Sequence, residues 1–163
     1  FQIPILPEND VNLAAMGYAR RTQLDRESTM AYLYLMKGSY AGSAVYLDGR
    51  LHLGKGRLAG ELPPAPYGVD WPRAETEDPK AVVENLVAMT LPYVMILAPH
   101  RMVLASDYIR EKHLKALRER LAALVPERYC PQFLLTEDFR QDYLEGVKRL
   151  VLDRITEFKE GKN

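Results

Sequence analysis

The sequence predicts an α/β domain with a mixed five-stranded sheet and helices on both faces. The first observation is three strand-like segments in succession, joined by glycine-containing turns, over residues 32–61. The second is that short apolar runs at 101–105 and 132–135 alternate with longer helical patterns. Successive antiparallel strands followed by crossover helices give a sheet that is antiparallel at one side and parallel at the other.

The first expected element is a helix that begins at Asn9 or Asp10, because either side chain can cap a helix N-terminus. Apolar residues then recur at helical spacing until Arg20-Arg21, at Val11, Ala14, Ala15 and Tyr18. Before it, the apolar run Phe1 to Leu6 is broken by Pro4, which is typical of an edge strand or a linker.

Three strands are expected next. Tyr32 to Met36 and Ser43 to Leu47 are rich in aromatic, aliphatic and β-branched residues, and the loop Lys37 to Gly42 between them contains two glycines. Asp48-Gly49 tolerates the positive φ angles of a type I′ turn and so joins the second strand to a third that begins at Arg50.

The middle of the chain begins with a glycine-rich bend, Gly54 to Gly60, which is followed by Glu61. Residues 63–72 form a proline-rich loop without regular structure. A helix is expected from about Pro79 to Leu97. It is apolar nearly all round, which predicts burial, and Pro92 should kink it.

The remaining elements complete the sheet. The strand Arg101 to Ala105 leads to Ser106-Asp107, which should cap a helix whose core-facing stripe is Ile109, Leu114, Leu117, Leu121 and Leu124. A strand at 132–135 and a helix from about Asp138 to Phe158 follow, the helix with Phe139, Tyr143, Val147, Leu150, Val151 and Ile155 on one side. This order is that of a ribonuclease H-like, actin-like half-domain.

Composition places few limits on function. The 163 residues suffice for one domain with a core, and 22 basic residues balance 22 acidic ones, so no global field favours nucleic acid or a membrane. The single cysteine, Cys130, excludes an intrachain disulfide, and no apolar run reaches the ~18 residues of a membrane span. We expect a reduced, cytoplasmic setting, and the start at Phe1 is typical of a piece of a longer protein.

Four short motifs occur in a characteristic order: Glu8-Asn-Asp-Val-Asn-Leu-Ala-Ala15, Asp48-Gly-Arg-Leu51, Gly54 to Glu61 ending in Ala-Gly-Glu, and Leu97-Ala-Pro-His-Arg-Met-Val-Leu104. In this order they resemble the ROK family of repressors, sugar kinases and related open reading frames. The resemblance covers most of the chain. It implies that residues 1–163 are a single C-terminal actin-like half-domain, with the upstream half and any DNA-binding domain outside this chain.

The resemblance also implies roles for individual residues. Asp10 matches the aspartate that acts in the kinases as general base on a sugar hydroxyl, and Asn9 and Glu61 match sugar-binding residues. Gly38 and Gly42 would belong to a degenerate loop that cradles ATP phosphates in the kinases. Carboxylates and amides suit sugars because they accept from or donate to vicinal hydroxyls.

Departures from the family pattern concern the cofactors. Leu62-Pro63-Pro64 replaces a glycine–histidine pair that supplies a sugar ligand, and the zinc loop expected after it contains no cysteine between Pro66 and Asp78. The phosphate loop lacks its threonine, and Ala105-Ser106-Asp107 stands where the kinases have glycines near adenosine. We therefore expect no zinc and no bound cofactor, with ATP and magnesium only if the protein is a kinase.

Three hypotheses follow. The favoured one is the sugar-sensing and dimerising domain of a ROK-type transcriptional regulator, which binds a small sugar, forms a homodimer and reaches DNA only through a segment outside this chain. The alternative is an ATP-dependent hexose kinase with Asp10 as base. A half-domain scaffold without a ligand is the third, since Asn9 and Asp10 are also ordinary helix caps. Ser106, Asp107 and His113 include the residue types of a hydrolase triad, but the first two are better explained as a helix cap.

Overall fold

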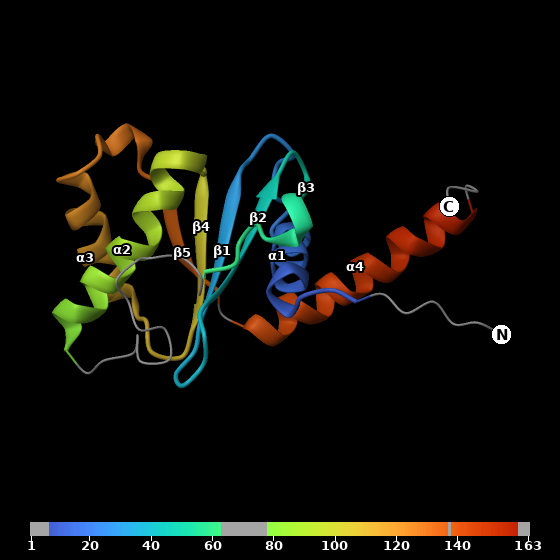
Figure 1. Cartoon of the computed structure of the whole chain (residues 1–163), viewed down its shortest axis with the longest axis horizontal. Helices are drawn as coiled ribbons and strands as arrows, with labels where there is room; N and C mark the ends of the chain where they lie inside the picture. Colours follow the sequence, from blue (N-terminus) through green and yellow to red (C-terminus); the bar gives the residue numbers. More distant parts are fainter. Residues whose placement is uncertain (1–6, 63–77, 137, 160–163) are drawn as a thin grey trace.

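One mixed five-stranded sheet organises the chain, in the order β3-β2-β1-β4-β5 (Figure 1). The computed structural model describes residues 7–62, 78–136 and 138–159. The strands are β1 (Met30–Leu35), β2 (Gly42–Leu47), β3 (Arg50–Leu51), β4 (Arg101–Ser106) and β5 (Gln132–Leu135). β2 runs antiparallel to β1 and β3, whereas β1, β4 and β5 are parallel. The predicted fold class is therefore confirmed.

The β2–β3 turn has the conformation that its two residues predict. Asp48 and Gly49 both have positive φ, 50° and 75°, as a type I′ turn requires. The register then follows, with Leu47 opposite Arg50 and Tyr46 opposite Leu51. β1 alternates between the faces of the sheet, so that Met30 and Tyr32 enter one core cluster while Ala31 and Leu33 enter the other.

α1 (Asp10–Arg21) and α4 (Phe139–Lys159) cover one face of the sheet. The two helices cross at two glycines. A Cβ on Gly17 would lie 1.8 Å from the carbonyl oxygen of Asp142, and a Cβ on Gly146 would lie 1.8 Å from that of Leu13. Side chains at these positions are thus excluded by backbone, and the absence of Cβ atoms allows the close helix–helix contact.

α2 (Pro79–Leu97) and α3 (Glu111–Ala122) cover the opposite face (Figure 1). By length and composition α2 could also cross a membrane, but core helices meet the same criterion. Here seven of its residues are buried, including Val82, Leu86 and Met89, which lie in the core cluster of this face. Short 3-10 turns, η1 (Lys55–Arg57) and η3 (Glu127–Tyr129), lie in the connections.

Two details of the helices differ from expectation. α2 is one helix with Pro92 inside it, and the kink expected there stays a prediction. α2 is not buried all round, because Met95 and Ile96 near its end are 65% and 87% exposed. α3 begins at Glu111 rather than after Ser106-Asp107, because the Ser106 hydroxyl instead accepts from the N–H groups of Tyr108 and Ile109 in a separate turn.

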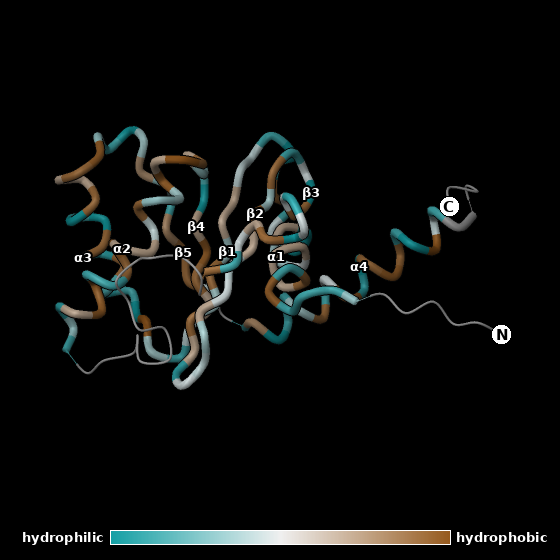
Figure 2. The backbone as a smooth tube through the Cα atoms, viewed as in Figure 1, coloured by the Kyte–Doolittle hydropathy of each residue, from teal (hydrophilic) through white to brown (hydrophobic). Residues whose placement is uncertain are grey.

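Apolar residues just beyond the end of α3 and in the second half of α4 lie outside the core. Leu124, expected in the α3 stripe, is 56% exposed. On α4 the expected apolar side is buried at its start, where Phe139 and Tyr143 pack against the core. Further along the same side, Val151 and Ile155 are 46% and 47% exposed. The second half of α4 projects away from the sheet, and Figure 2 shows apolar segments alternating with polar ones along it. The expected N-terminal segment 1–6 and proline-rich loop 63–72 lie outside the described residues.

Candidate functional site

The N-terminus of α1 presents two polar side chains that the sequence singled out. The Asn9 Oδ1 accepts from the N–H groups of Val11 and Asn12 at 2.8 and 3.3 Å, so Asn9 is the helix cap. The Asp10 Oδ1 also accepts from Val11 N–H, at 2.8 Å. Capping uses one oxygen of each side chain. The Asn9 amide nitrogen and the second Asp10 oxygen make no hydrogen bond with another described residue and remain available to a ligand.

Glu8, which motif matching did not place in the site, fixes this helix start to η1. Its carboxylate forms an ion pair with Arg57 and accepts from the Asn9 N–H and the Asn12 side-chain amide, both at 3.0 Å. Burial alone would raise the pKa of Glu8, but these hydrogen bonds outweigh it and hold the pKa below its usual value. Pro7, Glu8, Asn9 and Arg57 line an open cavity of about 350 Å³.

The bend that carries Glu61 is attached to the same end of the sheet. The Ser43 hydroxyl at the start of β2 donates to the Gly60 carbonyl at 2.6 Å. A Cβ on Gly60, whose φ is 94°, would lie 2.5 Å from the Ser43 carbonyl. Leu62 is fully buried and anchors the chain beyond the bend. Glu61 itself is exposed, and its side chain makes no hydrogen bond with another described residue.

Gly42 connects the bend and the helix start. A Cβ on this glycine would lie 2.9 Å from Cγ2 of Val11, in the first turn of α1, so β2 approaches the helix N-terminus closely. Ser43 is the next residue along β2. Asn9, Asp10 and Glu61 are therefore gathered around the start of β2, although no hydrogen bond joins Glu61 to the other two.

Tyr34 on β1 is influenced electrostatically by two carboxylates and was missed as a site residue. Burial raises the pKa of its phenol, and the negative charges of Asp10 and Asp107 add to that rise. The ring lies against Phe139 of α4, with centroids 4.6 Å apart. Tyr34 pairs with Ala105 near the end of β4, and its position at the carboxyl end of a central strand is the sequence signal that could have indicated it.

The loop after β1 is joined to the end of β4 by a carboxylate. The Asp107 Oδ1 accepts from the backbone N–H of Lys37 at 3.1 Å. Gly38 has a φ of 66° with open space where a Cβ would be, which explains the glycine by turn conformation. The close approach of Val11 explains Gly42 by packing. Both glycines thus have a structural reason that does not involve phosphate.

His100 and His113 each hold a turn or helix start by accepting a backbone hydrogen bond. The His100 Nδ1 accepts from the N–H of Thr29 at 3.0 Å, at the turn before β4. The His113 Nδ1 accepts from the N–H of Arg110 at 3.2 Å, at the start of α3. Burial first, and the neighbouring Lys112 and Arg110 charges second, lower the pKa of His113. No group of three or more histidine, cysteine or acidic residues in the described ranges is arranged to hold a metal.

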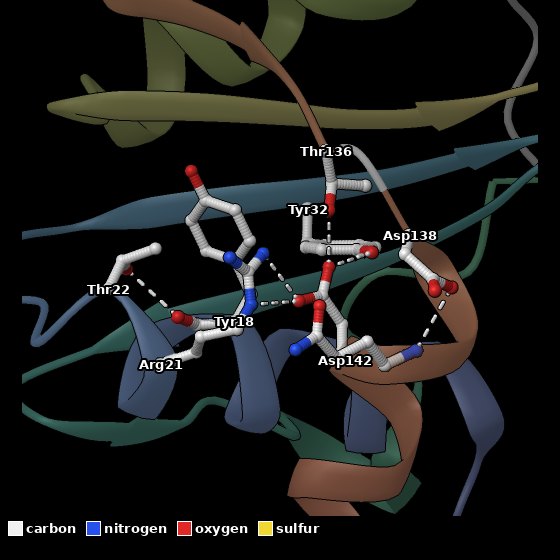
Figure 3. Close-up of polar contacts among 8 residues, drawn as sticks. Tyr18, Arg21, Thr22, Tyr32, Thr136, Asp138 and Asp142 are labelled. Carbon is white, nitrogen blue, oxygen red and sulfur yellow. Dashed lines mark hydrogen bonds and ion pairs between the residues drawn. The ribbon is translucent and has the colours of Figure 1, made fainter.

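A buried polar cluster beneath α1 also escaped sequence reasoning (Figure 3). The Asp142 side chain of α4 is fully buried. It accepts from Arg21 at 2.9 and 3.1 Å, from the Tyr32 hydroxyl at 3.0 Å and from the Thr136 hydroxyl at 2.6 Å. Burial and the adjacent Asp142 carboxylate raise the pKa of Tyr32, so its phenol stays protonated as a donor. The cluster joins α1, β1 and α4 and supports the helix that carries Asp10.

The arrangement is an α/β domain with one mixed five-stranded sheet and with polar groups at the start of α1 and near the carboxyl ends of β1 and β4. Solved structures with a similar fold are found among ROK proteins. No family model matches the chain, and a search of curated proteins finds no match. A ROK family protein from Streptococcus pneumoniae TIGR4, in complex with sucrose, matches with a TM-score of 0.65 at 16% identity, over 92% of this chain and 66% of that one.

Two further similar structures are a sugar kinase and a transcriptional regulator. A ROK hexokinase from Thermus thermophilus matches with a TM-score of 0.62 at 20% identity, over 88% of this chain and 65% of that one. A ROK family transcriptional regulator, a homologue of the E. coli Mlc protein, matches with 0.53 at 11% identity, over 86% and 50%. The resemblance to ROK proteins is thus confirmed at the level of the fold, and the chain spans 66% or less of these three structures.

Proposed function

We propose that this chain is the C-terminal sugar-sensing and dimerising half-domain of a ROK-type transcriptional regulator. The observation that carries the proposal is the hydrogen bond from the Lys37 N–H to the Asp107 carboxylate. In the kinases this loop would cradle nucleotide phosphates with backbone N–H groups. Here one such N–H already has an acceptor, and that acceptor brings a negative charge to the place where phosphate would bind.

The sugar side of the site supports the same proposal. Asn9 keeps free amide donors, Asp10 keeps one carboxylate oxygen, and Glu61 is exposed without a hydrogen-bond partner among the described residues. Vicinal hydroxyls can both donate to the carboxylates and accept from the amide. A half-domain that retains sugar contacts while opposing phosphate suits a sensor, which needs affinity without turnover.

Calorimetric titration of the full-length protein with hexoses and amino sugars, with and without MgATP, tests the proposal. We expect saturable sugar binding that MgATP does not change. Glu61→Gln should weaken it by about tenfold, the loss of one charged hydrogen bond, whereas the exposed carboxylate of Glu111, on α3, can be changed to Gln without effect. Heat that requires both sugar and MgATP would refute the sensor.

The alternative is an ATP-dependent hexose kinase with Asp10 as general base. It is favoured by the free Asp10 oxygen and by the fold shared with a ROK hexokinase. A carboxylate that contacts the sugar hydroxyl can take its proton as the phosphoryl group arrives. Sugar-dependent ADP release that Asp10→Asn abolishes, with sugar affinity retained, would establish this function in place of the first.

Partner and compartment belong to the same proposal. DNA binding would come from a segment outside this chain, and the protein would act in the cytoplasm. We propose a homodimer, in which a second copy covers the apolar side chains exposed on the projecting half of α4. The charged residues beside them are paired within the helix, as Arg149 with Asp153 and Arg154 with Glu157. Light scattering coupled to gel filtration should give twice the monomer mass, and Leu152→Glu should give the monomer.

A further inference from the structure

A second cavity lies at the other end of α1 from Asp10. Its volume is about 360 Å³, and it is bounded by the last turn of α1, the β2–β3 turn and the middle of α4. The charged side chains that line the cavity are Arg20, Arg26, Arg50, Arg149 and Asp153.

The charge in this cavity is unbalanced. Arg149 forms an ion pair with Asp153 at 2.8 Å, which neutralises both. Arg20, Arg26 and Arg50 form no ion pair with another described residue. Glu145 on α4 is paired with Lys148, and it interacts with Arg20 only through longer-range electrostatics. The lining therefore has an excess of three positive charges in a chain whose net charge is zero.

The walls are held in place by the β2–β3 turn. The Tyr46 hydroxyl donates to the Gly49 carbonyl at 2.7 Å. A Cβ on Gly49 would lie 3.1 Å from Cγ of Arg26, so the stem of this arginine lies against the turn. Arg50 follows in β3, paired with Leu47. Arg50 thus extends from this hairpin, and Arg26 packs against its turn. Because the hairpin restrains both side chains, they lose less conformational entropy when they bind a ligand.

We propose that this cavity binds a phosphate-bearing small molecule through Arg20, Arg26 and Arg50. Guanidinium groups present paired N–H donors that match phosphate oxygens, and several of them suit a dianion better than a single carboxylate. The volume accommodates a phosphate and a small organic group. The site is separate from the proposed sugar site and does not depend on it, because it lies at the opposite end of α1.

The test is titration calorimetry of the 163-residue chain in low-salt buffer, with inorganic phosphate and glycerol 3-phosphate as probes and sodium chloride at matched ionic strength as control. We expect saturable binding of one equivalent. Tighter binding of the ester would indicate a ligand with an organic group, and equal binding would indicate free phosphate; either result supports the site. Arg26→Gln/Arg50→Gln should weaken binding at least tenfold, and Gln keeps the Cγ that lies against Gly49.

The matched control removes the same charge elsewhere. Arg128 lies over the Tyr129 ring in η3, and Arg140 is exposed at the start of α4. Arg128→Gln/Arg140→Gln should leave phosphate affinity within twofold of the parent chain. Unsaturable heat, equal weakening by both double variants, or binding of duplex DNA in preference to phosphate would each overturn the proposal, because each would indicate general electrostatic attraction.

Discussion

Replacing Asp142 with alanine should remove much of the stability of the domain. The change leaves the buried Tyr32 hydroxyl without its acceptor, at a cost of about 1–3 kcal/mol. It also removes two hydrogen bonds from Arg21, worth about 1.5–3 kcal/mol each but discounted because Arg21 is 31% exposed and water can replace the carboxylate. We expect a loss of about 3–5 kcal/mol, against about 5–15 kcal/mol for a whole domain.

Urea unfolding followed by circular dichroism measures this loss, provided that the slope with urea is unchanged. Asp153→Ala is the matched control, because it removes the same residue type from the same helix where its partner Arg149 is exposed; it should cost less than about 1 kcal/mol. Tyr32→Phe in both backgrounds gives the coupling to Asp142, expected at about 1 kcal/mol or more. A loss below about 1 kcal/mol for Asp142→Ala, or one equal to the control, would refute the stabilising role of the cluster.

Three further predictions concern packing, pH and the site. Gly17→Ala or Gly146→Ala should destabilise by more than about 3 kcal/mol in thermal unfolding, since each Cβ would meet backbone at 1.8 Å. His113 has a lowered pKa in the folded state. Its contribution to stability is therefore complete above the unfolded pKa of about 6.5 and declines as pH falls toward the folded pKa. His113→Asn should reduce the dependence of the urea midpoint on pH between pH 7 and 5, and an unchanged pH dependence would contradict this. Asn9→Ala should cost about 1 kcal/mol of stability through the lost cap and also weaken sugar binding in calorimetry, whereas a loss of stability alone would assign Asn9 to capping only.

The sheet was predictable because its signals are local. The Asp48-Gly49 turn fixes its own backbone conformation, and the two parallel strands are short apolar runs between helical patterns. The start of α1 at Asp10 follows from the capping preference of Asn9 in the same way. These features depend on residues a few positions apart, so a single sequence contains them.

The polar clusters were not predictable because their partners are distant in sequence. Arg21 and Asp142 are 121 residues apart, and in the sequence each is an ordinary charged residue on a helix. The Asp107 contact with Lys37 likewise depends on the parallel pairing of β1 with β4. The same reason applies to the second half of α4: periodicity indicates an apolar side at Val151 and Ile155, but not whether another surface covers it.

The glycine crossing of α1 and α4 makes the two helices one mechanical unit. Backbone touches backbone at Gly17 and Gly146, so neither helix can slide or tilt independently without a collision. From Gly146 to the end of α4 at Lys159 the helix extends roughly 20 Å, at about 1.5 Å per residue. If the two helices tilt together by about 5°, the far end of α4 moves by about 1.7 Å. A small movement of α1 at Asp10 is therefore transmitted to the exposed end of α4.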